Sequence, residues 1–261
     1  LNVTGTGLVK MIGATNDITT SRLTLTGEGG ATHRLSSTSS DEIGSATSFT
    51  VALSAADRAA FNLIANQNGT QATGGTAYNL AAADDWNSVI TGGDISTTTA
   101  TLNVSGVNAP VIISATYDVA TGVLVVTGVR FLSKSGAAND IDVSKFTLTG
   151  EGGSTYTLTT ASVDVTDGTS STVTLNAADR AALTIINKNG TSSTGGSTYN
   201  LAAAVNWAAG ALAPLNGADL LGNSINVSNV GIPTLTSATY DAAIGALSVA
   251  GTGFLPRSGA N

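Results

Sequence analysis

Acidic and amide residues gather in one loop of the chain at a spacing that suits a calcium ion. The motif "ANDID" supplies Asn139, Asp140 and Asp142, and Glu151 follows in the glycine-rich turn "GEGG". Calcium prefers clustered carboxylate and carbonyl oxygens that are offered by loops. Calcium is therefore the candidate cofactor, with Asp140, Asp142 and Glu151 as its expected ligands.

A related loop near the N-terminus offers the same chemistry with one ligand fewer. It supplies Asn16, Asp17 and Glu28, but Thr19 stands opposite Asp142. Neither loop contains an EF-hand or a nonapeptide calcium motif. Acidic loop residues are commonly just solvated, so two interpretations stay open: calcium ligands, or ordinary hydrated loops.

Aromatic residues recur in a second pattern that could bind sugars. Trp86 and Trp207 match in position, and so do Tyr78 and Tyr199. Exposed pairs of this kind would stack on glycan rings. The alternative is that they anchor a short alanine-rich helix onto a sheet, as large aromatics commonly do.

Catalysis is not expected. The only histidine, His33, has Tyr156 as its counterpart in the second half of the chain, and we interpret both as ordinary strand-face residues. No "GxSxG" nucleophile elbow is present. The "GEGG" turn is no phosphate loop, because "GxxxxGK" is absent and a hairpin should follow.

Composition excludes several partners. The net charge is -7, and the 10 Lys and Arg residues form no cluster that could follow a phosphate backbone, so nucleic acid is not expected. There is no cysteine, which excludes disulfides and thiolate metal sites. No apolar run is long enough to span a bilayer. Residue 1 is Leu, which indicates a processed or excised piece.

The elements that would position these residues occur twice, at a spacing of 121 to 123 residues. Such a period is domain-sized rather than solenoid-sized. The matching phrases are "LTLTGEGGATHRL" and "FTLTGEGGSTYTL", "LSAADRAAFNLIANQNGT" and "LNAADRAALTIINKNGT", and "TGGTAYNLAAADDW" and "TGGSTYNLAAAVNW". A fourth pair, "ISATYDVATGVLVVTGVRF" and "TSATYDAAIGALSVAGTGF", opens a unit, and its second half also matches residues 1 to 8.

The repeat divides the chain into three parts. Residues 1–108 are a first unit without its opening strand, 109–231 are a complete unit, and 232–261 are the opening hairpin of a third. Within a unit we expect two hairpins, a further strand at "STVTL" and a closing strand near "NSINVSN". A helix should begin at the N-cap residue Ser54 or Asn176 and continue to "NG", and a second short helix should cover "YNLAAAVNW".

The openings "PVIISATYDVATGVLVVTGVRF" and "IPTLTSATYDAAIGALSVAGTGF" resemble immunoglobulin-like repeats of the IPT/TIG kind and related giant bacterial surface proteins. The resemblance implies a mainly β fold: tandem immunoglobulin-like β-sandwich repeats of about 123 residues, each here with a small helical insertion. It also implies an extracellular location at the bacterial cell surface. The expected function is a structural module of a filament, surface layer or adhesin stalk. The alternative is a calcium-dependent or glycan-binding adhesin module.

The expected partner is the protein itself, joined head to tail, and two arrangements are open. The chain is a slice of a longer covalent array, or its hairpin at 232–261 completes the first unit of another molecule by donor-strand addition. The duplication of 1–15 by 247–261 favours the covalent array, because the two segments would compete for one position.

Overall fold

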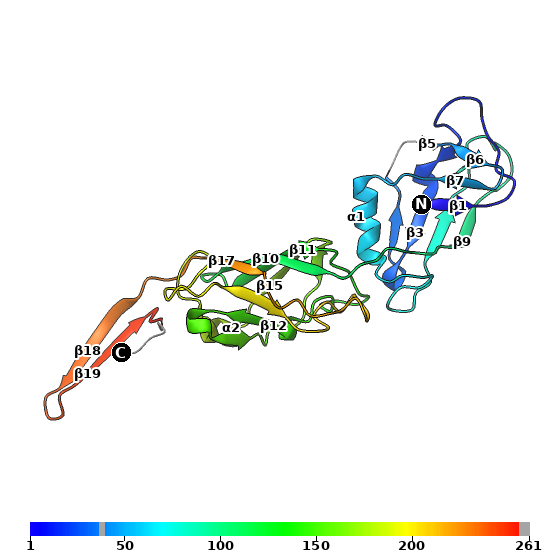
Figure 1. Cartoon of the computed structure of the whole chain (residues 1–261). Helices are drawn as coiled ribbons and strands as arrows, with labels where there is room; N and C mark the ends of the chain where they lie inside the picture. The colour runs from blue at the N-terminus through cyan, green and yellow to red at the C-terminus, as the bar shows by residue number, and fades with distance from the viewer. Residues whose placement is uncertain (37–39, 256–261) are drawn as a thin grey trace. The chain divides into compact units, whose positions relative to one another are not determined.

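The computed structural model describes residues 1–36 and 40–255, which fold into two compact units (Figure 1). Both are mainly β and contain several hydrogen-bonded sheets. Unit 1 comprises residues 1–110, 130–140 and 209–215, and unit 2 comprises residues 111–129, 141–208 and 216–261. The repeat boundaries inferred from the sequence remain a prediction.

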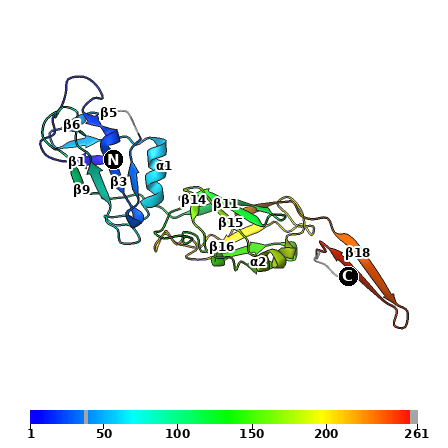
Figure 2. The ribbon, with the colours of Figure 1, turned by 180° about the vertical axis from the view of Figure 1, so that it is seen from behind.

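Unit 1 contains three small sheets, ordered β1-β7-β6, β4-β3-β8-β9 and β2-β5, with every pairing antiparallel. Helix α1 (Ala55–Ile64) lies beside the β3–β4 hairpin (Figure 1; Figure 2). The strands are β1 Asn2–Thr4, β2 Ile18–Thr19, β3 Leu23–Thr26, β4 Thr32–Arg34, β5 Ser40–Asp41, β6 Ile43–Ser45, β7 Ser48–Thr50, β8 Asn79–Ala82 and β9 Thr97–Thr101. Two 3-10 turns, η1 Thr20–Arg22 and η2 Glu28–Gly30, flank β3.

Unit 2 contains one continuous sheet, ordered β13-β12-β16-β17-β10-β11-β15-β14, and a separate hairpin of β18 and β19. Strand β10 is parallel to β17 and antiparallel to β11. The strands are β10 Val111–Asp118, β11 Val123–Val129, β12 Phe146–Thr149, β13 Thr155–Thr157, β14 Val165–Asp167, β15 Ser170–Thr174, β16 Asn200–Ala203, β17 Ser224–Ser228, β18 Thr234–Asp241 and β19 Ala246–Thr252. The helical segments are η3 Val143–Lys145, η4 Glu151–Gly153, α2 Ala177–Ala182 and η5 Leu183–Ile185.

The hairpins and helix caps are confirmed. Strands β10 and β11 are joined across residues 119–122, and β12 and β13 flank the "GEGG" turn. Ser54 caps α1 by accepting a hydrogen bond from the backbone N–H of Asp57, and Asn176 caps α2 in the same way through Asp179. The predicted ends of these helices are wrong: α1 ends at Ile64 and α2 at Ala182, before the "NG" dipeptides at 68–69 and 189–190 are reached. Ala65 has already left the helical conformation in unit 1, and the 3-10 turn η5 replaces the α-helix in unit 2.

The second short helix is wrong: the "YNLAAA" segments form strands β8 and β16. Burial alternates along each strand, so that in β16 Leu201 and Ala203 are buried while Asn200 and Ala202 are partly exposed. Each strand pairs with a neighbour, as β16 does with β12 through Leu201 and Leu148. Cross-strand pairing therefore overrides the helix propensity of alanine.

The core of each unit is built from the inward faces of these strands together with large aromatic residues. In unit 2, Phe146 and Trp207 are fully buried, with ring centroids 6.0 Å apart. In unit 1, Phe49 and Trp86 stack at 5.8 Å. In the described part of the chain, no helix is both long enough and apolar enough to cross a membrane.

Candidate functional site: buried carboxylates that bind backbone amides

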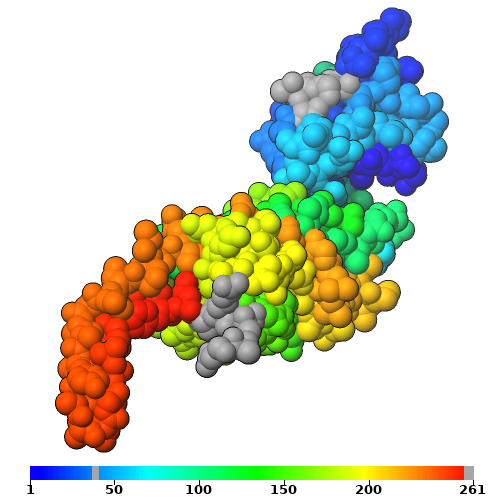
Figure 3. All heavy atoms as spheres, turned by 60° about the vertical axis from the view of Figure 1, so that its left-hand side comes forward, coloured from blue at the N-terminus to red at the C-terminus, as the bar shows by residue number. Residues whose placement is uncertain are grey.

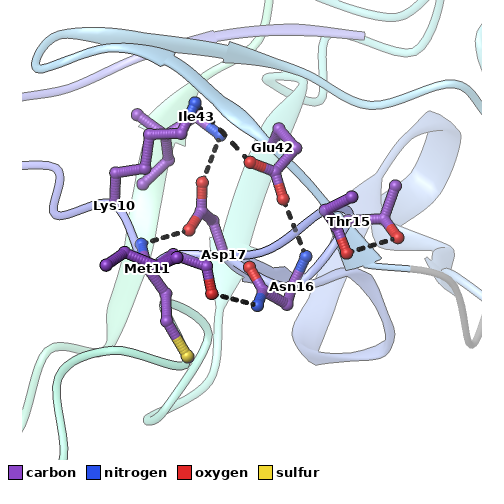
Figure 4. Close-up of polar contacts among 9 residues, drawn as sticks. Lys10, Met11, Thr15, Asn16, Asp17, Glu42 and Ile43 are labelled. Carbon is purple, nitrogen blue, oxygen red and sulfur yellow. Dashed lines mark hydrogen bonds and ion pairs between the residues drawn. The ribbon is translucent and has the colours of Figure 1, made fainter.

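Asp17, one of the expected calcium ligands, is fully buried and accepts hydrogen bonds from the backbone of two separate loops (Figure 4). The backbone N–H of Met11 donates to its Oδ1 at 2.6 Å, and that of Ile43 to its Oδ2 at 2.9 Å. Burial alone would raise the pKa of Asp17, but the hydrogen bonds from Met11 and Ile43, together with the nearby charge of Lys10 and an interaction with Glu42, lower the pKa overall. Asp17 therefore holds the loop at residues 10–16 against the start of β6.

Asp140 and Asp142 also accept hydrogen bonds from residues close to them in the chain. Asp140 is buried, and its Oδ1 accepts the backbone N–H of Lys134 at 2.5 Å. Asp142 caps the turn η3 by accepting from the backbone N–H and the hydroxyl of Ser144, at 3.1 and 2.6 Å. Thr19 stands at the matching cap position of η1 and makes no side-chain cap. The replacement of Asp142 by Thr19 thus removes a helix cap.

Glu28 is buried and gathers three N–H donors around one carboxylate. Its Oε2 accepts from the backbone N–H of Gly74 at 2.8 Å and from the side chain of Asn66 at 3.1 Å. Its Oε1 accepts from the backbone N–H of Ser135 at 3.0 Å. Burial would raise the pKa of Glu28, but the donors of Gly74, Ser135 and Asn66 lower it overall. A Cβ at Gly74 would lie 2.3 Å from Oε1, which explains the glycine.

The Glu28 cluster attaches segment 130–140 to the rest of unit 1. Besides the bond from Ser135 to Glu28, the backbone N–H of Ser133 donates to the carbonyl oxygen of Leu63 at 2.9 Å. The side chain of Asn66 donates to the carbonyl oxygen of Ser133 at 2.8 Å. A single carboxylate and a single amide therefore connect the "GEGG" turn, the end of α1 and a distant segment.

Glu151 occupies the matching place in unit 2. Its Oε2 accepts from the side chain of Asn187 and from the backbone N–H of Gly195, both at 2.9 Å. Glu28 makes the corresponding bonds with Asn66 and Gly74. The repeated "GEGG" glutamate is thus a repeated structural anchor.

The sequence analysis did not identify a further kind of buried carboxylate, which occurs once in each unit as Asp57 and Asp179. Asp179 is fully buried and accepts from the hydroxyl of Tyr156 at 3.0 Å. The backbone N–H groups of Thr159 and Thr160 donate to it at 2.9 and 2.8 Å, and the hydroxyls of both threonines also donate. Burial would raise the pKa of Asp179, but the donors, the threonine hydroxyls first, lower it.

His33 has a structural partner that the strand-face interpretation did not include. Its Nε2 lies 2.9 Å from Oδ1 of the fully buried Asp57, in the place that the hydroxyl of Tyr156 takes beside Asp179. The backbone N–H and the hydroxyl of Ser36 donate to the same Oδ1, at 2.8 and 2.9 Å. The signal in the sequence was the repeat of Asp at the third helical position together with a polar ring on the preceding hairpin.

The arrangement around Asp57 does not make a nucleophile. The hydroxyl of Ser36 donates to the carboxylate of Asp57, whereas a catalytic serine donates to a histidine base. Asp57 has its pKa held well below its usual range, because hydrogen bonds from Ser36 and His33 overcome the effect of burial. The hydrogen bonds from Ser36 and His33 therefore stabilise the charged carboxylate of Asp57 and join the β4 hairpin to helix α1.

The repeated aromatics are core residues rather than an exposed sugar platform. Tyr78, Tyr199 and Trp207 are at most 1% exposed. Trp86 is partly buried, and its indole N–H donates to the carbonyl oxygen of Ile95 at 2.8 Å. These aromatic residues are buried, as the anchoring interpretation required, but the helix that they were expected to anchor does not form, because the "YNLAAA" segments are strands.

Calcium binding has to compete with these N–H donors. Among residues 1–36 and 40–255, no three His, Cys, Asp or Glu side chains gather closely enough to hold a metal ion. The candidate carboxylates instead accept N–H groups, each of which a cation would have to displace. The arrangement indicates anchoring of loops.

We expect calcium at about 1 mM, the range in which extracellular modules bind, to leave the melting temperature of residues 1–261 unchanged relative to equal magnesium. The reason is that Asp17 and Glu28 already have N–H donors on both oxygens. Differential scanning calorimetry in both salts measures this. A rise specific to calcium, removed by Asp142→Asn, would contradict the expectation.

The same carboxylates predict a loss of stability in acid. The pKa values of Asp17, Glu28, Asp57 and Asp179 are lowered on folding from ordinary values of 3.8 for Asp and 4.5 for Glu. Their contribution is complete above the unfolded-state pKa and is lost as the pH falls through the folded-state pKa. We expect the free energy of unfolding to be level from about pH 8 to pH 5.5 and to fall below about pH 4.5. Urea titrations across this range measure it, and a maximum below pH 4 would contradict it.

In both units, therefore, buried carboxylates hold loops in place by accepting hydrogen bonds from their backbone N–H groups. Comparison of the chain with protein-family models, with curated proteins and with solved structures gives no match.

Proposed function

We propose that the chain is a structural module of an extracellular bacterial surface assembly, built from tandem immunoglobulin-like β-sandwich repeats of about 123 residues with a helical segment in each. One observation supports this most strongly. The residues that recur along the sequence are the anchors of the fold, as Glu28 and Glu151 are for the "GEGG" turn. The residues that the two halves have in common are thus residues that hold the fold together.

The differences between the halves support the same role. His33 and Tyr156 differ in chemistry but donate to equivalent buried carboxylates, Asp57 and Asp179. A catalytic or ligand-binding site shared by both halves would need the same functional group in both places. A structural position needs only a donor of suitable reach.

The location and the size of the native protein test this proposal. Antibodies raised against residues 1–261 should label intact cells of the source organism, and protease added to intact cells should remove the signal. The intact mass of the native polypeptide should exceed the 25.7 kDa of residues 1–261, as a longer array of such repeats requires. Labelling that requires cell lysis would overturn the surface location.

A further inference from the structure

The sequence contains the acceptor motif for N-linked glycans, Asn-X-Ser/Thr, at several places. The motifs begin at Asn2, Asn68, Asn103, Asn189 and Asn226. In an N-linked glycan the sugar is bonded to the side-chain nitrogen of an asparagine at the protein surface. The contacts of each asparagine side chain therefore decide which of these motifs suits a glycan in the folded chain.

In three of these motifs the asparagine side chain already has a partner. The Oδ1 atom of Asn2 accepts from a hydroxyl of strand β7 at 2.9 Å. Asn68 donates through Nδ2 to the carbonyl oxygen of Val107 at 3.3 Å and accepts the backbone N–H of the same residue at 3.0 Å. Asn189 accepts the backbone N–H of Val230 at 2.9 Å. Each of these side chains therefore joins two segments of the chain.

Asn226 has no such partner and faces outward from the middle of β17. Burial alternates along this strand, so that Ile225 and Val227 are at most 3% exposed while Asn226 is exposed. No residue of the described part of the chain forms a hydrogen bond with its side chain. Asn103, its counterpart in the first half, is exposed and likewise has no side-chain partner among the described residues. The two asparagines that the fold does not use are thus those of the motif "NVS".

The hydroxyl that the motif requires lies on the same outward face. Residues i and i+2 of a strand point to the same side, so Ser228 projects beside Asn226, and Ser228 is exposed. The neighbouring side chains are small. Thr116 of β10 lies opposite Asn226, Ser224 precedes it on the same face, and Gly190 bridges to β17 from the other side. These neighbours leave room for a sugar ring.

We propose that Asn226 and Asn103 carry N-linked glycans. Strand β17 lies beside β10 (Figure 1), and orange atoms from this part of the chain are visible at the surface of unit 2 (Figure 3). The inference rests on the extracellular location proposed above, because the motif is an acceptor in exported proteins.

The sugar would come from a lipid-linked oligosaccharide phosphate or pyrophosphate, transferred by an enzyme of the cell. The bond from sugar C1 to the phosphate oxygen breaks, and the phosphate leaves with the bonding electron pair. A bond from C1 to Nδ2 forms, and the amide nitrogen loses one proton. Both co-substrates are thus accounted for, and no oxidant or reductant is needed.

A glycan on this face would add hydration that the chain itself supplies sparingly. Only 10% of its residues are charged, and the outward residues of β17 are Ser224, Asn226 and Ser228. N-linked glycans are bulky and solubilising. The modification would therefore keep an uncharged sheet face hydrated.

Digestion with a protease that cleaves before aspartate separates all the motifs, because an aspartate lies between each pair. In protein purified from the source organism, mass spectrometry should find a saccharide on peptides 94–117 and 219–240, and fragmentation should place it on Asn103 and Asn226. Peptides 57–83 and 179–218, which contain Asn68 and Asn189, should be unmodified. An "NVS" peptide recovered only at its unmodified mass, a saccharide on a hydroxyl instead, or equal occupancy of Asn68 would overturn the proposal.

Three variants expressed in the same organism test the motif in unit 2. Ser228→Ala should remove the glycan from Asn226, whereas Ser228→Thr should retain it, because either hydroxyl completes the motif. Ser224→Ala is the matched control on the same exposed face, outside the motif, and should retain the glycan. A glycan that survives Ser228→Ala, or one that Ser224→Ala removes as well, would contradict recognition of this motif.

Surface labelling of intact cells separates this inference from the structural role. A chain that is labelled on intact cells but carries no saccharide overturns the glycan sites alone. A chain that is found only inside the cell and carries no saccharide overturns the extracellular location as well.

Discussion

Asp179→Ala should lower the free energy of unfolding of unit 2 by about 3–5 kcal/mol, as expected when one partner of a buried charged network is removed. The carboxylate of Asp179 has no exposed surface and receives bonds from the backbone and hydroxyls of Thr159 and Thr160 and from Tyr156. Alanine leaves these donors buried without an acceptor, and each such donor costs about 1–3 kcal/mol. The threonines cannot all turn to water, because Thr160 is itself buried.

Trp207 provides the measurement, since it is buried in unit 2 and the only other tryptophan is Trp86. In a Trp86→Phe background, urea unfolding followed by tryptophan fluorescence reports on unit 2. Asp167→Ala is the matched control, because Asp167 accepts from the backbone and hydroxyl of Thr169 at an exposed turn. It should cost less than about 1 kcal/mol. Equal losses for the two variants would show that the buried network has no special role.

The parts of the fold that the sequence predicted are those decided by short-range chemistry. The hairpin at 118–123 follows from a turn between two alternating apolar runs, and the caps Ser54 and Asn176 follow from helix-end hydrogen bonding. These signals need only neighbouring residues. The hairpin and the caps could therefore be predicted without knowledge of the tertiary structure.

The parts that the sequence did not predict depend on partners far along the chain. The alanines of β16 predict a helix, but the segment is a strand because Leu201 pairs with Leu148 across the sheet. Asp179 reads as a residue of the first helical turn, but it is buried beneath the hairpin that carries Tyr156. In both cases a long-range contact decides the outcome, and a local pattern cannot contain it.

The candidate calcium residues show a further limit. Their types and spacing were interpreted as calcium ligands, with hydrated loops as the alternative, and could not show which N–H donors the carboxylates receive. The structure supplies backbone N–H groups to Asp17 and to Glu28. Glycine-rich loops expose many such groups, so an acidic residue in a glycine-rich loop is as well suited to hold the loop as to hold a cation.

Separate expression of residues 109–231 and 1–108 should give one fragment that melts cooperatively and one that does not. The longer fragment contains β10 and hence the continuous sheet. The shorter fragment has no counterpart of β10 between β1 and segment 101–105. It also loses segment 130–140, so Glu28 no longer receives the backbone N–H of Ser135.

The size of the difference follows from the apolar residues beside the missing strand: Leu1, Val3, Leu102 and Val104. Four apolar side chains there are partly buried, whereas their counterparts beside β10 are at most 3% exposed. Full burial of one such side chain stabilises by about 1.5–3 kcal/mol, so a half-covered set of four loses about 3–6 kcal/mol. A domain of this size has about 5–15 kcal/mol in total, which places the 1–108 fragment near or below the limit of stability.

Calorimetry and circular dichroism of the two fragments measure this difference, and an added strand separates its two causes. If the missing strand is responsible, the sequence of residues 109–123 placed ahead of Leu1 should restore cooperative melting to 1–108. If the lost segment 130–140 is responsible, the added strand should have no effect, whereas Glu28→Gln should destabilise the full chain as much as the truncation does. Comparable melting of the two unmodified fragments would contradict the boundaries at 108 and 231, because it would mean that β10 is dispensable to the sheet that it joins in unit 2.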